Sequence, residues 1–144
     1  MSRPDTIRLL EHEMGVLIRR VRRVIGERAR AVHPDLQPMS YLLLARLAEA
    51  GPMRSSALAG TFGIDKGAIS RQVRHLSELQ LIEKTADPAD GRATLLAASR
   101  EAVRRLEEVR RERRALLDER LHGWSEDDLS GFVADLARYN QTLE

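Results

Sequence analysis

The sequence predicts a mainly α-helical chain that carries one small β-hairpin. Over most of its length, apolar residues recur at spacings of three and four, the period of a helix with one buried side. Between residues 81 and 98 this period is lost, and two strand-like runs flank the turn sequence ADPADG. The predicted order is four helices, a hairpin and two further helices. The 144 residues are enough for one domain with its own core.

The first predicted helix runs from about Asp5 to Val32. Its apolar residues alternate at spacings of four and three, nearly a coiled-coil period; they are Leu10, Met14, Leu17, Val21 and Val24. HPDLQP ends this helix. Pro38 suits the first turn of the next helix, which runs to Ala50, because a first-turn N–H has no helical partner to lose. Gly51 and Pro52 then stop it.

Two short helices are predicted next. We expect Ser55 or Ser56 to cap the first, and Gly63 to end it with a positive φ. Asp65 is expected to cap the second, which runs from Lys66 to about Leu79. One face of this second helix is apolar, with Ile69, Val73 and Leu76. The other side carries Gly67, Arg71, Arg74, His75 and Glu78.

The hairpin has about twelve strand residues, too few to be stable without the preceding helices. A long helix from Ser99 to about His122 follows, with a middle, Arg110–Arg114, that is polar nearly all round. WSEDDL starts the last helix, where Ser125 is the expected cap and acidic residues suit the positive end of the helix dipole.

The apolar stripes of the first and last helices need a partner, and a second copy of the chain would bury them. We therefore expect a homodimer.

The composition excludes several kinds of chemistry. Cysteine is absent, so disulfides, thiolate catalysis and thiolate metal sites are ruled out. His12, His33, His75 and His122 are scattered without metal-ligand spacing, and the acids beside His12 do not share its helix face. We expect no metal and no cofactor. No apolar run approaches the roughly 18 residues that cross a membrane, so we expect a soluble, cytoplasmic protein.

The stretch from Ser55 to Ala98 indicates nucleic-acid binding. A helix-turn-helix places the N-terminal part of its second helix in the major groove of DNA. The second helix opens with Lys66 and has small outer residues, Gly67 and Ser70. Hydrogen-bond donors follow at Arg71, Gln72, Arg74 and His75. All but two of the 24 basic residues in the chain are Arg, which binds phosphates and guanine edges bidentately.

The hairpin tip would reach the flanking minor groove, where an Arg senses narrow A·T-rich segments. Arg92 lies at this tip, and Asp90 can accept a hydrogen bond from its guanidinium. The alternative is an ordinary solvated helix followed by a surface hairpin, because exposed Arg is common.

The run DKGAISRQVRHLSELQLIEKTADPADGRATLLAAS resembles the winged helix-turn-helix core of the MarR family of bacterial regulators. The matching motifs are Ser70-Arg71, Leu79 with Leu81-Ile82, and the wing Asp87-Pro88-Ala89-Asp90-Gly91-Arg92-Ala93. The flanking helices also follow the family order. The resemblance implies one domain, residues 1–144, with a DNA-binding core at about 38–98 and dimerisation helices at about 5–32 and 99–143.

The resemblance further implies a DNA-binding transcription regulator, expected to be a repressor, whose homodimer reads a palindromic site in double-stranded DNA. By position, Ser70, Arg71, Gln72 and Arg74 would meet bases and phosphates. Arg92 would enter the minor groove with Asp90 as its support, and Ser55 and Ser56 would receive a phosphate. Two departures from the family pattern are Gly91, where Arg is frequent, and Ala98–Ala102, where Leu-Thr-x-x-Gly is frequent.

Many members of this family release DNA when a small anionic or phenolic ligand binds between the dimerisation helices and the winged core. The corresponding residues here are His12, Arg19, Met39 and Tyr41. A His and an Arg could anchor a carboxylate beside apolar walls. Each of the four residues also has an ordinary explanation in core packing or surface solvation.

Two other classes of function are alternatives. An enzyme is the first, but the sequence has no HExxH motif, Gly-rich phosphate loop or nucleophile elbow, so we predict no catalytic residue. A protein-binding adaptor that uses the winged core without DNA is the second. Such an adaptor would lack the steep salt dependence of DNA affinity that phosphate contacts produce.

Overall fold

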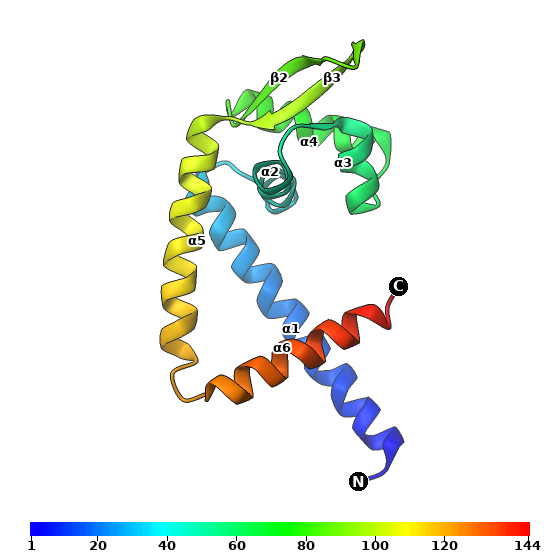
Figure 1. The fold of residues 1–144 in the computed structure, drawn as a ribbon, viewed down its shortest axis with the longest axis vertical. Coiled ribbons are helices and arrows are strands. Elements are labelled where there is room, and N and C mark those ends of the chain that lie inside the picture. Colours follow the sequence, from blue (N-terminus) through cyan, green and yellow to red (C-terminus); the bar gives the residue numbers. More distant parts are fainter. The chain divides into compact units, whose positions relative to one another are not determined.

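The computed structural model describes all residues from Met1 to Glu144. Its elements, in chain order, are α1 (Arg3–Val32), α2 (Pro38–Ala50), β1 (Met53–Arg54), α3 (Ser55–Phe62), α4 (Lys66–Glu78), β2 (Ile82–Asp87), β3 (Asp90–Ala98), α5 (Arg100–Arg120) and α6 (Glu126–Gln141) (Figure 1). The predicted order of helices and hairpin is confirmed. The chain forms two compact units, Met1–Val109 and Arg110–Glu144.

The helix ends follow from local chemistry. α1 starts earlier than predicted because Ser2 and Asp5 form a capping box, in which the Asp5 N–H donates to Ser2 Oγ at 3.3 Å. Gly51 and Gly63 end α2 and α3 at φ values of 83° and 61°, as expected. Asp65 caps α4, its Oδ1 accepting from the Ala68 N–H at 2.7 Å.

The predicted cap of α3 is wrong. Arg54 occupies the N-cap position, and no side chain accepts a hydrogen bond from the first turn. Ser55 and Ser56 are instead the first two residues of the helix itself. The first backbone N–H groups of α3 are therefore not bonded to a capping side chain.

The core of the first unit lies where α2 packs against α4 and the strands. Leu43, Leu44 and Leu47 of α2 are at most 1% exposed. The predicted apolar face of α4 is buried as well, with Ile69 at 2%, Val73 at 7% and Leu76 at 0%. Each fully buried side chain of this kind contributes roughly 1.5–3 kcal/mol, so this packing fixes the orientation of α4.

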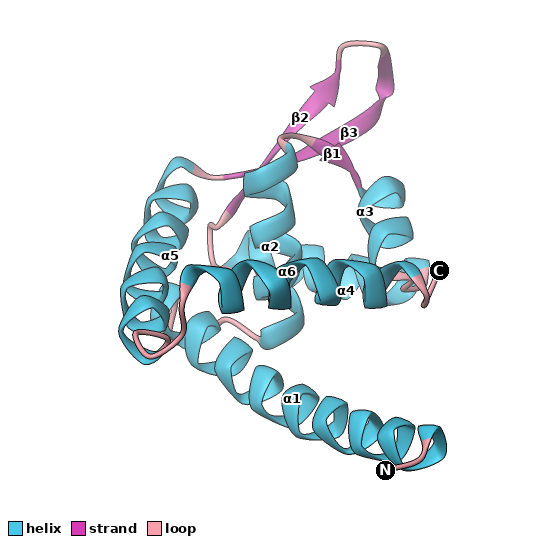
Figure 2. Ribbon diagram, turned by 60° about the horizontal axis from the view of Figure 1, so that its bottom comes forward, coloured by secondary structure: helices cyan, strands magenta, loops and turns pink.

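The sheet has three antiparallel strands in the order β1-β3-β2. β1 was not predicted, because two residues are too short to show an alternating pattern. Arg54 of β1 and Thr85 of β2 both pair with Leu95, so the three residues form one row across the sheet. Figure 2 shows the hairpin of β2 and β3, the wing, extending beyond the helices of this unit.

The ladder between β2 and β3 is interrupted near the tip of the wing. Ala86 pairs with Thr94, whereas the next residue, Asp87, pairs with Asp90. Residues 91–93 therefore have no partner on β2. Arg92 lies in this irregular segment and is exposed.

α5 starts inside the first unit and is held there by polar contacts. Ser99 is buried and caps the helix, its Oγ accepting from the Ala102 N–H at 3.1 Å. The Ser99 N–H in turn donates to the carbonyl of Leu81 at 2.9 Å. The Arg105 guanidinium donates to the carbonyl of Val32, at the end of α1, at 3.0 Å.

The second unit, Arg110–Glu144, contains no buried residue. Ser125 caps α6 as predicted and forms a capping box with Asp128. The rings of Trp124 and Phe132 pack edge to face, with centroids 5.7 Å apart. No helix of the chain has a segment long and apolar enough to span a bilayer.

Candidate DNA-binding surface

α4 presents three different polar sides around its buried face, because a helix turns once in about 3.6 residues. Gly67, Arg71, Arg74 and Glu78 share the side opposite the core, and all four are exposed. Lys66 and Ser70 lie on the flank toward α3 and the sheet. Gln72 and His75 lie on the flank toward α2.

The outward side of α4 agrees with the prediction. Neither Arg71 nor Arg74 forms a salt bridge, so both guanidinium groups are available to a partner. A Cβ at Gly67 would lie 3.5 Å from Nη1 of Arg71 and 3.3 Å from Oδ1 of Asp65. Because glycine has no side chain, nothing projects from the first turn of α4 beside the Arg71 guanidinium.

Gln72 and His75, expected to face outward, each accept a hydrogen bond from α2 or its N-cap residue. The buried Ser40 hydroxyl of α2 donates to Oε1 of Gln72. The Gln37 N–H, at the start of α2, donates to Nε2 of His75 at 3.4 Å. Both side chains are partly buried and contact α2. Gln72 lies about 100° around the helix from Arg71, whereas His75 follows Arg71 by one turn and lies at the edge of the outward side.

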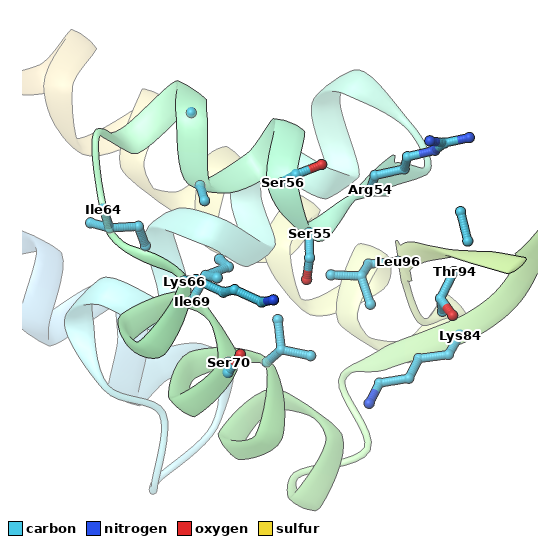
Figure 3. Close-up of a pocket in the computed structure, with 14 residues that line it drawn as sticks. Arg54, Ser55, Ser56, Ile64, Lys66, Ile69, Ser70, Lys84, Thr94 and Leu96 are labelled. Atoms are coloured by element: carbon cyan, nitrogen blue, oxygen red, sulfur yellow. The ribbon is translucent and has the colours of Figure 1, made fainter.

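A cleft of about 770 Å³ separates α3 and α4 from the sheet (Figure 3). Its apolar floor includes Ile69, Val73 and Leu96. Its polar rim comprises Arg54, Ser55, Ser56, Lys66, Ser70, Lys84 and Thr94. Hydroxyl groups and cations around an open cleft are suited to an anionic backbone such as that of DNA.

Three residues of this rim were not predicted: Arg54, Lys84 and Thr94. Lys84 could have been found, because strand alternation places it on the same face of the sheet as the buried Ile82. Arg54 and Thr94 gave no comparable signal. Arg54 lies on a strand of two residues, and Thr94 is paired beside the interruption of the ladder.

Asp90 contacts the backbone of Arg92 and not, as the sequence suggests, its guanidinium. Oδ1 of Asp90 accepts from the backbone N–H of Arg92 at 3.0 Å, and no ion pair joins the two side chains. Asp90 therefore shapes the backbone of the wing. The Arg92 guanidinium is exposed and has no partner in the chain.

An ion pair that was not predicted lies at the other end of the turn. Nε and Nη2 of Arg54 both lie 2.7 Å from Oδ2 of Asp87. Oδ1 of Asp87 accepts from the Ala89 N–H at 2.9 Å. The Ala89 hydrogen bond, and after it the Arg54 hydrogen bond, lower the pKa of Asp87 below its usual value of 3.8.

The four residues proposed for a ligand have different environments. Tyr41 is 7% exposed and belongs to the hydrophobic core, as the packing explanation requires. His12, Arg19 and Met39 are exposed. No group of three or more His, Asp or Glu side chains is arranged to hold a metal ion.

Comparisons with known proteins agree with this architecture. A model of the MarR family matches residues 35–93, from just before α2 into β3 of the wing. The uncharacterized HTH-type transcriptional regulator YxaD of Bacillus subtilis (strain 168) is 31% identical over 143 residues, which cover 99% of each chain.

Solved structures share the whole fold. The crystal structure of MarR has a TM-score of 0.71 at 23% identity, covering 93% of this chain and 96% of MarR. Streptococcus pneumoniae FabT in complex with DNA has a TM-score of 0.82 at 14% identity, covering 95% and 96% of the two chains. The family and the fold are those of transcriptional regulators and not of enzymes. The chain belongs to the MarR family of DNA-binding transcriptional regulators.

Proposed function

We propose that the chain is a repressor that binds a palindromic site in double-stranded DNA as a homodimer. The observation that carries this proposal is the outward side of α4, where Arg71 and Arg74 are exposed and unpaired. They lie on the same helix as Lys66 and Ser70, which line the cationic cleft. A single unit thus offers groups for base edges and for phosphates side by side.

The N-terminal half of α4 is the proposed major-groove element. Gly67 allows the helix to approach the base edges closely. Arg71 is placed to read a guanine through its O6 and N7 atoms, a bidentate contact that Lys cannot make. Arg74 and Ser70 would add phosphate or base contacts. Gln72 and His75 are left out of this set because their side chains hold α4 to α2.

The cleft between α3, α4 and the sheet is the proposed site of the phosphate backbone. Ser55 and Ser56 open α3, whose first backbone N–H groups have no capping side chain. Free N–H groups at a helix start, together with the helix dipole, favour an anion. Lys66 and Lys84 would neutralise phosphates in the same cleft.

The wing is the proposed minor-groove element. Arg92 is exposed in the segment where β3 lacks a partner on β2. An unpaired guanidinium at this position suits the negative potential of a narrow A·T-rich minor groove. Asp90 contributes by bonding the Arg92 backbone, which fixes the local course of β3.

Dimerisation through the terminal helices is part of the proposal. α1 exposes Leu10 at 41%, Leu17 at 43% and Val21 at 43%. α6 exposes Phe132 at 50% and Val133 at 58%. Apolar surfaces of this kind are typical of interaction sites. A two-fold dimer would present two copies of α4 to half-sites about 34–36 Å apart, which accounts for the palindrome.

The proposal also includes release of DNA when a small anionic or phenolic effector binds. We expect the protein to act in the cytoplasm and to form one domain. His12, Arg19 and Met39 remain the proposed contacts because they are exposed, whereas Tyr41 is a core residue. Titration of the protein–DNA complex with benzoate and with phenol tests this part. A loss of DNA binding that Arg19→Ala abolishes would support it.

The DNA-binding proposal is tested by selection from duplexes with a random central segment, followed by fluorescence anisotropy at several salt concentrations. We expect an inverted repeat to be enriched. Its affinity should fall linearly on logarithmic axes, with a slope of about −0.9 for each phosphate neutralised. Enrichment of no sequence, with binding that is weak and insensitive to salt, would favour the adaptor alternative.

A further inference from the structure

We propose that Arg54 is a positioning residue, and that its ion pair with Asp87 sets the direction of the wing and thereby the place where Arg92 meets DNA. This inference depends on the proposed function, because it assumes that the wing contacts the minor groove. Arg54 is on β1, outside the wing itself. Its side chain therefore links the wing to the part of the sheet that is continuous with α3.

The ion pair spans the whole width of the sheet. Arg54 belongs to the edge strand β1 and Asp87 to the opposite edge strand β2, with β3 between them. Arg54 is in the row of Thr85, whereas Asp87 lies two residues further toward the tip. The guanidinium thus reaches diagonally toward the tip, and Figure 3 shows it pointing away from the centre of the cleft.

The contact falls at the point where the sheet is weakest. Residues 91–93 of β3 have no partner on β2, so backbone hydrogen bonds do not fix the outer part of the wing there. Residues 88–92 are also exposed, and packing does not hold them. A side-chain bond across the interruption can supply the missing constraint on the angle between the tip and the rest of the sheet.

Asp87 transmits this constraint to the turn. Oδ2 of Asp87 accepts from Nε of Arg54 and also lies 2.7 Å from Nη2, and Oδ1 accepts a hydrogen bond from the Ala89 N–H. The Asp87 side chain is only 12% exposed although it lies near the tip, whereas that of Arg54 is 44% exposed. Beyond the turn, Asp90 bonds the Arg92 backbone, and the Ala89–Asp90 peptide bond joins this contact to the one that Asp87 makes with Ala89.

A simple phosphate contact is the rival role for Arg54, since it also lines the cleft. The two roles predict opposite effects for Asp87→Asn. If Arg54 only supplies charge, removing the negative charge of Asp87 should leave DNA binding unchanged or make it tighter. If the pair positions the wing, the same change should weaken binding, although Asn can still accept from the Ala89 N–H.

The experiment measures anisotropy with the selected duplex in two forms, one with A·T-rich flanks and one with G·C-rich flanks. We expect Asp87→Asn to weaken binding to the A·T-flanked duplex by roughly 3- to 10-fold, with less effect on the other duplex. The matched control is Glu83→Gln, which removes the same charge from an exposed position of β2 that has no ion pair. This control should bind at least as tightly as the wild type.

A second variant, Arg54→Lys, keeps the charge and loses the two-nitrogen contact with Asp87. It should show the same loss on A·T flanks, whereas a pure phosphate contact would be nearly unchanged. In an Arg92→Ala background, neither Asp87→Asn nor Arg54→Lys should reduce binding further. Both variants should fold, because an ion pair at the surface, with its Arg54 side chain 44% exposed, adds little to stability; circular dichroism melting verifies this.

The inference is overturned if Asp87→Asn binds as tightly as the wild type or more tightly, or if the loss persists undiminished in the Arg92→Ala background. In either case the wild type would still bind its duplex, and the proposed function would stand. Failure of the wild type to bind any selected duplex would instead overturn the proposed function and this inference together.

Discussion

The middle of the chain, from α2 to the start of α5, buries its apolar residues. The terminal helices leave theirs exposed. In the middle, Leu43, Leu44 and Leu58 are all 0% exposed, and the fold supplies its own core. In the second unit, by contrast, no residue is buried, and Trp124, Phe132 and Val133 are 46–58% exposed. The N-terminal half of α1 shows the same pattern, with Leu17 at 43%.

This difference separates two sources of stability. The middle gains its free energy of folding from contacts within one chain, so its stability should not depend on concentration. The terminal helices are amphipathic and gain free energy only when their apolar faces are covered. If a second copy covers them, their stability is linked to concentration by mass action.

The largest effect is expected in the core of the middle. Leu44→Ala should lower the free energy of unfolding by about 2–5 kcal/mol, because it removes a fully buried side chain and leaves a cavity. Urea denaturation followed by circular dichroism measures this. The control, Glu49→Ala, changes an exposed residue of the same helix and should stay within about 0.5 kcal/mol. Equal behaviour of the two variants would mean that α2 is not the centre of the core.

The next effect is expected at the terminal helices. Val133→Glu places a charge on the exposed apolar side of α6 and should convert a dimer into monomers. DNA affinity should then fall by roughly 100-fold or more, because the two half-sites would no longer be bound as one unit. Light scattering and anisotropy report the two changes. Ala134→Glu adds the same charge next to Val133, toward the polar side of α6, and should remain dimeric.

A dimeric Val133→Glu variant would remove the main support for pairing through α6. The exposed apolar residues of the second unit would then be covered by something other than a second copy pairing through α6. The Leu44 result would not be affected, since that residue belongs to the core of the first unit.

A smaller effect is expected on the DNA-facing side of α4. Arg71→Ala should weaken specific binding by about 1–3 kcal/mol and relax the preference at one base pair of each half-site. Folding should be unchanged, because Arg71 is exposed and forms no salt bridge in the chain. Repeating the selection with this variant measures the preference directly. Unchanged affinity and preference would show that α4 does not read bases through Arg71.

The parts of the fold that the sequence predicts correctly depend on contacts between residues that are close together along the chain. The face formed by Ile69, Val73 and Leu76, and the end of α3 at Gly63, depend on residues within a few positions of each other. Helical periodicity and turn chemistry express such short-range relations directly. These parts of the fold, and the exposure of Arg71, therefore agree with the prediction.

The unpredicted contacts join residues that are far apart along the chain. Ser40 bonds Gln72 across 32 positions, Gln37 bonds His75 across 38, and Arg54 pairs with Asp87 across 33. Local patterns show only that these residues are polar, and they carry no information about which distant residue each one contacts. Only the packing of α2 against α4, and of β1 against β3, determines their partners.

The smallest effect tests where the stable middle ends along α5. Glu101 accepts hydrogen bonds from Arg104 and Arg105, which lower its pKa from 4.5 to about 2. Because the folded-state pKa is depressed, the stabilisation is complete above pH 4.5 and is lost as the pH falls toward about 2. Glu101→Gln should therefore lower the melting temperature by roughly 1–3 °C at pH 7, and the difference should vanish in strong acid.

The matched control for this titration is Glu112→Gln, on the part of α5 that belongs to the second unit and outside any ion pair of the chain. It should melt like the wild type at every pH. Arg105 also bonds the end of α1, so the Glu101 contact stabilises the junction of α1 and α5 within the first unit. If both variants shifted the melting temperature equally, the start and the middle of α5 would share one environment, and the division between a self-sufficient middle and dependent ends would have to be drawn further along this helix.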